Sequence, residues 1–537
     1  MSEVTMVDTA QSVETTAPRG PHSGVRRVSV VHCFEFAARR YAYFVRTGDI
    51  VRLSPPAFDA LSMVDRGEDL ASIAAALNQS YGEEIARGVL TEIEGLTAEG
   101  YLSRELEFTG VELEGDVQSL LRHHPRNIMF LVTEACNLAC TYCYELQQGV
   151  HARARTLKKA DARKIIDAYF EGSLGRDQWT VTFFGGEPLL NFPVVRETTE
   201  YALQRAKELG KAVDFTLTTN LTLLTDEIAE FLASNRFHVM VSIDGEREAH
   251  DRYRKTVDGR GTYDKVTANL QLLIEKMKKH RTRLPKIRAT LTAENTDARA
   301  VEEHLKSLGT HLVMVGGSHG TVEKGKQEFD VGGGASGNLL ERPSPVALGA
   351  FEALAELDRN PDAQPKLGAG TVEGLQRVHA EVTRRQAHRH ARPSLCGVCR
   401  NMKAVTPTGD IYPCHRYVGM EPFKLGNVHT GGADPEKVRK YYESLYANFQ
   451  VECAKCWARH LCGGQCPWTL ATAEGGVLPP DQDDCALIRR TQENVLGLYA
   501  VLLESYPRAF EKLMATNPAD ISGVWLPSGA PDDSCRS

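Results

Sequence analysis

The chain has 537 residues, a formal net charge of -7 and 42% hydrophobic residues, which suits a protein of several globular domains. The acidic balance argues against a general nucleic-acid binder, because such proteins carry an excess of lysine and arginine. No apolar run reaches the roughly 18 residues of a membrane span, and residues 1–20 are polar, without an apolar signal segment. We therefore expect a cytoplasmic protein that binds neither nucleic acid nor membranes.

The first part of the chain predicts a small α+β domain. Residues 1–25 are rich in Ser, Thr, Gly and Pro and are expected to form a disordered tail. Short apolar runs then predict strands at residues 28–36, 41–45 and 50–53, and helical periodicity predicts three helices ending near Leu102. We assign residues 26–105 to this domain, which would be winged-helix-like, and the acidic residues 106–124 to a linker.

From residue 125 the chain alternates between strands and helices. Candidate strands are Ile128–Val132, Thr180–Phe184, Phe215–Thr219, His238–Ile243, Ile287–Leu291 and His311–Val315, with amphipathic helices between them. Six such repeats predict a parallel sheet, in the form of a partial (β/α)6 TIM-like barrel over residues 125–320. In such barrels the chemistry lies on loops at the carboxyl ends of the strands.

The remainder divides into three parts by composition. Residues 321–392 are predicted to form a Gly-rich insert followed by helices; its Gly332–Gly337 run lacks the preceding strand that a nucleotide-binding loop needs. Residues 393–490 form a Cys-rich domain. Residues 491–537 comprise a predicted helix and a polar tail.

The cysteines are numerous and grouped. In a reducing cytoplasm, 13 cysteines indicate metal binding or catalysis rather than disulfide bonds. One group is Cys136, Cys140 and Cys143; a second is Cys396, Cys399 and Cys414; a third is Cys453, Cys456, Cys462, Cys466 and Cys485. Only Cys33 and Cys535 stand apart.

The first group reads C-x3-C-x2-C directly after the first barrel strand. Three thiolates can hold three corners of a [4Fe–4S] cluster and leave the fourth iron open to a substrate. A zinc site completed by a distant fourth ligand is the alternative interpretation of this loop.

This loop resembles that of the radical S-adenosylmethionine (SAM) superfamily, which also has an aromatic residue before the last cysteine, here Tyr142. The second strand ends in Gly185, Gly186, Glu187 and Pro188, and the resemblance implies that this segment contacts the amino group of SAM. Glycines permit close backbone approach, and a carboxylate can accept from an ammonium group.

The resemblance continues at the ends of the third and fourth strands. It implies that Asn220 bonds the ribose or carboxylate of SAM and that Ser242, with Asp244 beside it, lies near the SAM carboxylate. Superfamily members often have glycine after this asparagine, whereas this chain has Leu221. Ordinary hydrogen bonding at strand ends is the alternative role for these residues.

The C-terminal cysteines resemble the SPASM domain, an auxiliary-cluster module of peptide-modifying radical SAM enzymes. The resemblance implies two further [4Fe–4S] clusters, making three in all. It assigns Cys396, Cys399, Cys414 and Cys466 to one auxiliary cluster, and Cys453, Cys456, Cys462 and Cys485 to the other. A zinc ribbon would use only half of these thiols.

Within this group, the segment around Cys414 resembles SPASM peptide maturases. Sulfatase maturases carry an aspartate directly after the cysteine, as their proposed base, but this chain has His415. The sequence is therefore more similar to enzymes that form thioethers, such as maturases of six-cysteine SCIFF peptides and of the quinohemoprotein amine dehydrogenase small subunit. His415 would be a catalytic proton acceptor or, alternatively, a hydrogen-bonding group beside a cluster.

The resemblance thus implies an enzyme that generates a 5′-deoxyadenosyl radical from SAM, abstracts hydrogen from a ribosomally made peptide and forms a Cys thioether. The N-terminal domain resembles a PqqD-like element that would bind the leader of the precursor peptide along a strand edge. A flavodoxin or ferredoxin would supply electrons. C–C or C–O cross-linking, epimerisation and sulfatase-type oxidation are alternative reactions, and a non-catalytic metal scaffold or electron carrier is the alternative outside catalysis.

Overall fold

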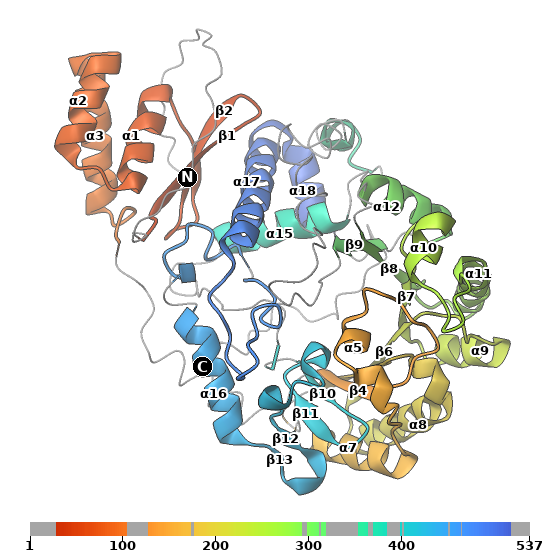
Figure 1. The fold of residues 1–537 in the computed structure, drawn as a ribbon. Helices are drawn as coiled ribbons and strands as arrows, with labels where there is room; N and C mark the ends of the chain where they lie inside the picture. The colour runs from red at the N-terminus through yellow and green to blue at the C-terminus, as the bar shows by residue number, and fades with distance from the viewer. Residues whose placement is uncertain are drawn as a thin grey trace.

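The structure is a computed structural model of the chain, and Figure 1 shows its ribbon. It describes residues 28–104, 127–172, 175, 177–292, 298–310, 313–317, 353–362, 369–383, 398–399, 402–448, 452–462 and 464–516. Three predicted features lie outside these residues: the N-terminal tail, the 106–124 linker, and the Gly-rich run of the insert. Cys396 and Cys535 do so as well.

The N-terminal strands and helices are confirmed. Strands β1 (Val31–Phe36), β2 (Arg39–Phe44) and β3 (Ile50–Arg52) form an antiparallel sheet in that order. Helices α1 (Pro55–Arg66), α2 (Leu70–Tyr81) and α3 (Glu83–Ala98) follow. The helix starts follow capping chemistry, because the side chains of Ser54 and Asp69 accept hydrogen bonds from the first turns of α1 and α2.

All six barrel strands are present and parallel, with bounds within a few residues of those predicted. They are β4 (Asn127–Thr133), β5 (Gln178–Gly185), β6 (Ala212–Thr219), β7 (His238–Ser242), β8 (Lys286–Leu291) and β9 (Val313–Gly317), paired in chain order. Strand β9 extends to Gly317, two residues beyond the predicted end at Val315.

Helices connect these strands. They are α5 (Tyr144–Gln147), α6 (Val150–Arg153), α7 (Lys159–Glu171), the 3-10 helix η1 (Pro188–Asn191), α8 (Phe192–Glu208), α9 (Asp226–Ser234), α10 (Arg247–Tyr253), α11 (Tyr263–Lys279) and α12 (Ala298–Ser307). Their apolar stripes cover one face of the sheet, where Trp179, Val181, Phe183, Phe215 and Val239 are fully or almost fully buried.

The opposite face of the sheet carries polar side chains. Because side chains alternate along a strand, the residues between the buried ones point the other way, into a cavity; they include Thr182, Thr216, Thr218, His238, Ser242, Lys286, Arg288 and Thr290. A closed TIM barrel would fill this interior with branched apolar residues. Here the interior is hollow and polar, as a substrate site requires.

The Cys-rich region extends the same sheet, which the sequence analysis did not predict. Strands β10 (Met402–Val405), β11 (Asp410–Tyr412), β12 (Gly426–Asn427) and β13 (Gly432–Ala433) follow β4 outward, with β10 parallel to β4 and the others antiparallel. The 3-10 helices η3 (His415–Tyr417), η4 (Glu421–Phe423) and η5 (Val428–Thr430) and helix α16 (Pro435–Asn448) complete this region. Residue 415 thereby lies on the same sheet as the first cysteine loop.

The C-terminal helices join the N-terminal sheet. Helices α15 (Ala369–Thr383), α17 (Gln482–Ser505) and α18 (Pro507–Ala515) share a core with β1 and β2, and Figure 1 shows α17 beside these strands. His32 of β1 stacks on Trp457 at 3.7 Å between ring centroids. Helix α17 crosses the domain boundary predicted at residue 490 and carries Cys485.

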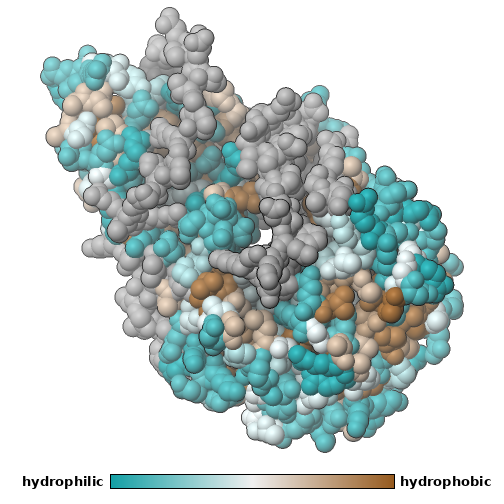
Figure 2. All heavy atoms as spheres, viewed as in Figure 1, coloured by the Kyte–Doolittle hydropathy of each residue, from teal (hydrophilic) through white to brown (hydrophobic). Residues whose placement is uncertain are grey.

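The surface is largely polar. On the face shown in Figure 2, hydrophilic residues dominate and apolar ones form scattered patches. In the part of the chain that the structure describes, no helix has the length and apolar character needed to cross a membrane.

Candidate functional site

A cavity of about 490 Å³ runs along the polar face of the parallel sheet and reaches the carboxyl ends of its strands. Its wall includes all three cysteines of the first group, Cys136, Cys140 and Cys143, together with His415 and Arg416 of the Cys-rich region. The structure thus brings together residues that lie almost 280 positions apart in the sequence. The parallel pairing of β4 with β10 brings the segments that follow these two strands to the same end of the sheet.

The cysteine loop is fixed by backbone hydrogen bonds to the end of β5. The amide of Gly186 donates to the carbonyl of Thr133 (3.0 Å), and that of Glu187 donates to the carbonyl of Ala135 (3.0 Å). A Cβ on Gly185 would lie 2.2 Å from the Thr133 carbonyl oxygen, and one on Gly186 would lie 2.2 Å from that of Ala135. The two glycines therefore permit a close approach between strand end and loop.

The buried carboxylate of Glu187 connects the ends of β5 and β6 through hydrogen bonds. Its carboxylate accepts hydrogen bonds from the Thr219 hydroxyl (2.7 Å) and from the amides of Asn220 (2.7 Å) and Leu189 (3.0 Å). Burial raises the pKa of this carboxyl to about 7, although these donors favour the charged form. Both carboxylate oxygens are thus engaged by the protein itself, which gives the side chain a positioning role.

Asn220 connects β6 to the cysteine loop. Its amide nitrogen lies 3.9 Å from the Cys136 sulfur and donates to Asn137 (3.0 Å), while its oxygen accepts from the Thr222 amide (3.0 Å). The Leu138 amide also points at the Cys136 sulfur (3.5 Å). N–H groups directed at a thiolate are typical of the surroundings of metal-bound cysteines.

The position after Asn220 shows why glycine is common there in the superfamily. Leu221 has φ +61°, a left-handed conformation that a branched side chain adopts only at a cost. Its side chain is nevertheless fully buried. The packing of this leucine therefore offsets its backbone strain.

We expect Leu221→Gly to lower the free energy of unfolding by only about 2 kcal/mol. Loss of the buried side chain costs roughly 3–5 kcal/mol, and relief of the left-handed backbone returns about 1–2 kcal/mol. Leu221→Ala keeps the strain and should be less stable than Leu221→Gly, the reverse of the usual order. Denaturant unfolding of the two variants checks this; an alanine variant that is the more stable would contradict the strain.

Six of the eight residues predicted to contact SAM line the cavity, namely Tyr142, Gly185, Gly186, Glu187, Asn220 and Ser242. Pro188 starts the buried helix η1, and Asp244 lies behind the wall; neither is a lining residue. Asp244 instead holds Arg254 through two hydrogen bonds (2.7 and 3.0 Å) and accepts from the Tyr142 hydroxyl. Arg254 in turn lies over the Tyr142 ring.

His415 adjoins the cavity as a neutral imidazole. Burial, and secondarily the nearby Arg416 and Arg288, lower its pKa to about 3. Its ring lies 4.4 Å from that of Phe184, and its Nδ1 atom has no hydrogen-bond partner in the described structure. The side chain can therefore accept a hydrogen bond from a molecule bound in the cavity, but its low pKa makes it a weak base.

Two residues near Cys143 were not identified from the sequence. Glu145 and His151 lie within reach of the Cys143 sulfur, with the ligand atoms of all three within 4.8 Å of one another. His151 Nε2 lies 3.3 Å from the Glu145 carboxylate. The C-x3-C-x2-C signature does not extend to these positions, so no sequence signal marked them.

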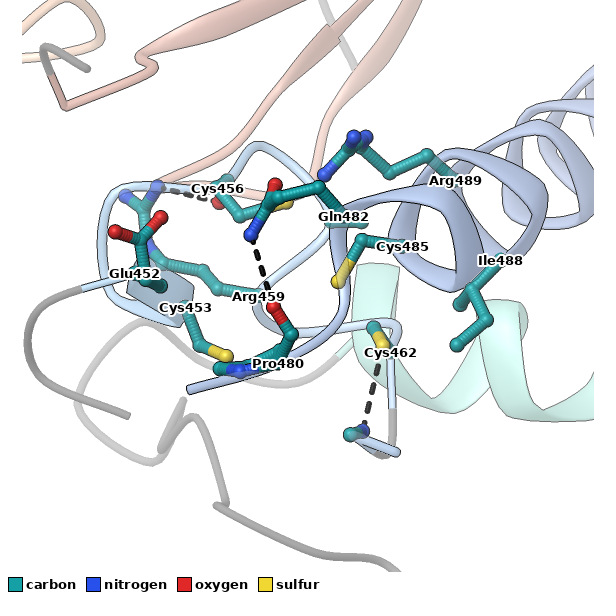
Figure 3. Close-up of a pocket in the computed structure, with 12 residues that line it drawn as sticks. Glu452, Cys453, Cys456, Arg459, Cys462, Pro480, Gln482, Cys485, Ile488 and Arg489 are labelled. Atoms are coloured by element: carbon teal, nitrogen blue, oxygen red, sulfur yellow. Dashed lines mark hydrogen bonds between the residues drawn. The ribbon is translucent and has the colours of Figure 1, made fainter. Parts of the chain in front are cut away.

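Four of the C-terminal cysteines surround a second, smaller cavity of about 40 Å³ (Figure 3). They are Cys453, Cys456, Cys462 and Cys485, the last projecting from α17 toward the loop that carries the others. This is the set that the SPASM resemblance assigned to one auxiliary cluster. Burial raises the pKa of Cys453 to about 12, so a free thiolate there is disfavoured without a nearby cation.

The other auxiliary set is described for three of its four members. Cys399 and Cys414 are both buried, and the Cys399 amide donates to the carbonyl of Pro413, the residue before Cys414 (3.1 Å). Cys466 is half-buried and packs against the main core. Tyr144 lies close enough to both Cys143 and Cys414 for each to raise the pKa of its hydroxyl, after burial as the main cause.

The spacing of the cysteines bears on the kind of metal site. Thiolates bound to one zinc ion at about 2.3 Å lie roughly 3.8 Å apart. Among the described residues, the group of three ligand atoms within 4.8 Å of one another is Cys143, Glu145 and His151. No three described cysteines have sulfur atoms that close. No three of the described cysteines therefore have the sulfur spacing of a single-zinc site.

Comparisons with known proteins bear on the parallel sheet and its cysteine loop. Residues 130–288 match the family model described as the radical SAM superfamily. A serine-type anaerobic sulfatase-maturating enzyme of Bacteroides thetaiotaomicron is 26% identical over 353 residues, covering 63% of this chain and 81% of that protein.

Solved structures with the same fold include native anSMEcpe with bound AdoMet, at 19% identity and a TM-score of 0.53, covering 72% of this chain and 98% of that one. The same protein with AdoMet and the Cp18Cys peptide matches at 20% identity and a TM-score of 0.52, covering 72% of this chain and 99% of that one. At such identities these structures establish the fold. Taken with the family match over the cysteine loop and strands, they lead to one conclusion: the chain is a radical SAM enzyme, with residues 130–288 in its radical SAM domain.

Proposed function

We propose that this enzyme is a SPASM peptide maturase, which modifies a ribosomally made peptide and forms a Cys thioether in it. The observation that carries the proposal is the cavity shared by the first cysteine loop and His415 of the Cys-rich region. A related solved structure holds both AdoMet and a peptide, which supports a peptide as the molecule that enters this cavity.

The residues of the cysteine loop suit a [4Fe–4S] cluster. Cys136, Cys140 and Cys143 would hold it. Burial raises the pKa of Cys140 to about 11, so a neighbouring cation would favour ionisation of that thiol. With SAM bound at its open iron, the cluster would supply an electron that breaks a C–S bond of SAM and yields a hydrogen-abstracting radical.

The protein's own groups would orient the cofactor. The backbone of Gly185 and Gly186 lies at the cavity wall, and Ser242 and Arg254 offer hydrogen-bond donors there. The Asp244 carboxylate fixes the guanidinium of Arg254 and the hydroxyl of Tyr142 in place. The predicted role of His415 as proton acceptor is weakened by its low pKa, and we assign it a hydrogen bond to the peptide instead, since its Nδ1 is unpaired beside the cavity.

We further propose two auxiliary [4Fe–4S] clusters, held by the two cysteine sets that the SPASM resemblance defines. Cys414 precedes His415 directly, so the first of these clusters would lie next to the cavity and could receive an electron from the modified peptide. A flavodoxin or ferredoxin is the proposed electron donor, and the cytoplasm the proposed compartment.

The N-terminal domain is proposed to bind the leader of the precursor peptide. In its sheet β3 forms one edge, and Val51 and Arg52 of that strand are exposed, whereas β1 contacts α17. An extended leader could therefore pair with β3.

We also propose that the sheet β4–β9 curves as a partial barrel, with its polar face turned toward the substrate.

Sulfatase-type oxidation is the second candidate, favoured by the similarity to a sulfatase-maturating enzyme. His415 argues against it, because the sulfatase maturases carry aspartate at this position as their proposed base. Cross-linking through C–C or C–O bonds and epimerisation remain alternative outcomes of the same hydrogen abstraction.

Metal analysis and mass spectrometry test the proposal together. After anaerobic reconstitution we expect about twelve irons and twelve sulfides per chain, corresponding to three cubane clusters. Co-expression with candidate precursor peptides should give a product 2 Da lighter per thioether, with one free thiol fewer in alkylation. Four irons per chain would contradict the auxiliary clusters, and an unchanged peptide mass across the candidates would contradict thioether formation.

A further inference from the structure

Two of the arginines that line the cavity have no carboxylate partner among the described residues. Arg288 projects from β8 and Arg416 from η3, and both line the cavity near His415. Neither forms an ion pair with a carboxylate among the described residues, and Arg416 Nη1 is buried without a hydrogen-bond partner. By contrast, Arg254 in the same wall is held by both oxygens of Asp244.

The position of Arg416 is fixed by aromatic rings rather than by an acid. Its guanidinium carbon lies 5.6 Å from the centre of the Tyr144 ring and 5.2 Å from that of Trp468. These contacts favour a cation, and Nη1 is left without a hydrogen-bond partner. A guanidinium held in this way is ready to bind a planar anion without further ordering.

The two charges act on each other. Burial lowers the pKa of Arg288, and the nearby Arg416 lowers it further. When no anion is bound, the two like charges repel each other. A bound anion relieves that repulsion. The cavity therefore carries an excess of positive charge beside His415.

We propose that Arg288 and Arg416 form a carboxylate-binding pocket for an aspartate or glutamate side chain of the peptide substrate. The inference rests on the proposed function, since it takes a peptide as the substrate. It also gives His415 a context, because this imidazole lies near both guanidinium groups. An acidic residue of the substrate complements that arrangement.

The carboxylate of SAM is a second source of the same chemistry, because Arg288 also lies near Arg254 and Tyr142. Binding measurements separate the two sources. The probes are SAM itself and the precursor peptide whose mass changes on co-expression, each titrated into the anaerobically reconstituted enzyme by calorimetry. The variants are Arg288→Gln and Arg288→Lys. The control is Arg260→Gln, because the Arg260 side chain is 79% accessible.

We expect Arg288→Gln to raise the Kd of the peptide by about 10- to 100-fold, the usual effect of losing one charged hydrogen-bond pair. Replacing the recognised Asp or Glu of the peptide with its amide should give the same loss, and the two changes together should add little more. Arg288→Lys should restore part of the affinity, and Arg260→Gln should change nothing.

Two results would overturn the pocket while leaving the proposed function intact. One is a modified peptide whose acidic residues can all be replaced by amides without loss of affinity. The other is an Arg288→Gln enzyme that binds the peptide normally and SAM weakly, which assigns the arginine to the cofactor. A wild-type enzyme that modifies no peptide would instead reject the proposed function, and the pocket with it.

Discussion

Replacing Cys136 with alanine is expected to abolish reductive cleavage of SAM. Cys136 is one of three thiols on the loop after β4, and two N–H groups, from Leu138 and Asn220, point at its sulfur. A cluster with only two protein ligands is bound too weakly to persist. We expect 5′-deoxyadenosine formation to fall by at least ~1000-fold, measured anaerobically with dithionite, and iron to fall from about twelve to about eight per chain.

The matched control is Cys33→Ala. Cys33 lies in β1, packs against the N-terminal core and belongs to none of the three cysteine groups. It should leave both iron content and SAM cleavage unchanged. Retention of cleavage in Cys136→Ala, with the same iron content as wild type, would remove the basis for placing the SAM site at this loop.

The sequence predicted the barrel elements well because their signals are local. Each strand is a short apolar run, such as Ile128–Val132, and each helix repeats its apolar residues every three to four positions. The cysteine loop was found from its spacing, and the Gly-Gly-Glu-Pro segment from its resemblance to the radical SAM superfamily. Their location at the ends of β4 and β5 follows from the parallel pairing of these strands.

The sequence could not predict how distant segments meet. The pairing of β10 with β4 joins residues more than 270 positions apart, and short strands such as β12 carry almost no periodic signal. The inward-facing arginine of β8 was also missed. Its strand, Lys286–Leu291, does alternate polar and apolar residues, which was the available clue to a polar cavity.

A motif can be found in a sequence before the contacts of its residues are known. Glu187 and Asp244 were expected to contact SAM because they stand in or beside familiar motifs. In the structure both carboxylates accept hydrogen bonds from protein groups, namely Asn220 and Thr219 for Glu187, and Arg254 for Asp244. A motif marks the position of a side chain, whereas its hydrogen-bond partners decide whether it binds a ligand or supports a residue that does.

Gly186→Ala is expected to inactivate the enzyme without touching a cysteine. The new Cβ would lie 2.2 Å from the Ala135 carbonyl oxygen and 2.5 Å from its carbon, whereas carbon contacts prefer about 3.5 Å. Because the obstacle is backbone, the start of the cysteine loop must move by roughly 1 Å, and such a displacement in a reactive site costs about 100-fold in rate. SAM cleavage should fall by that factor.

The control for this substitution is Gly95→Ala in α3, where the added Cβ meets nothing within 4 Å. It should leave SAM cleavage unchanged and raise the free energy of unfolding by about 0.5–1 kcal/mol, because alanine loses less backbone entropy than glycine in a helix. The two substitutions are chemically identical, so a difference between them isolates the contact with the loop. Wild-type cleavage by Gly186→Ala would show that this contact does not hold the cysteines in their reactive positions.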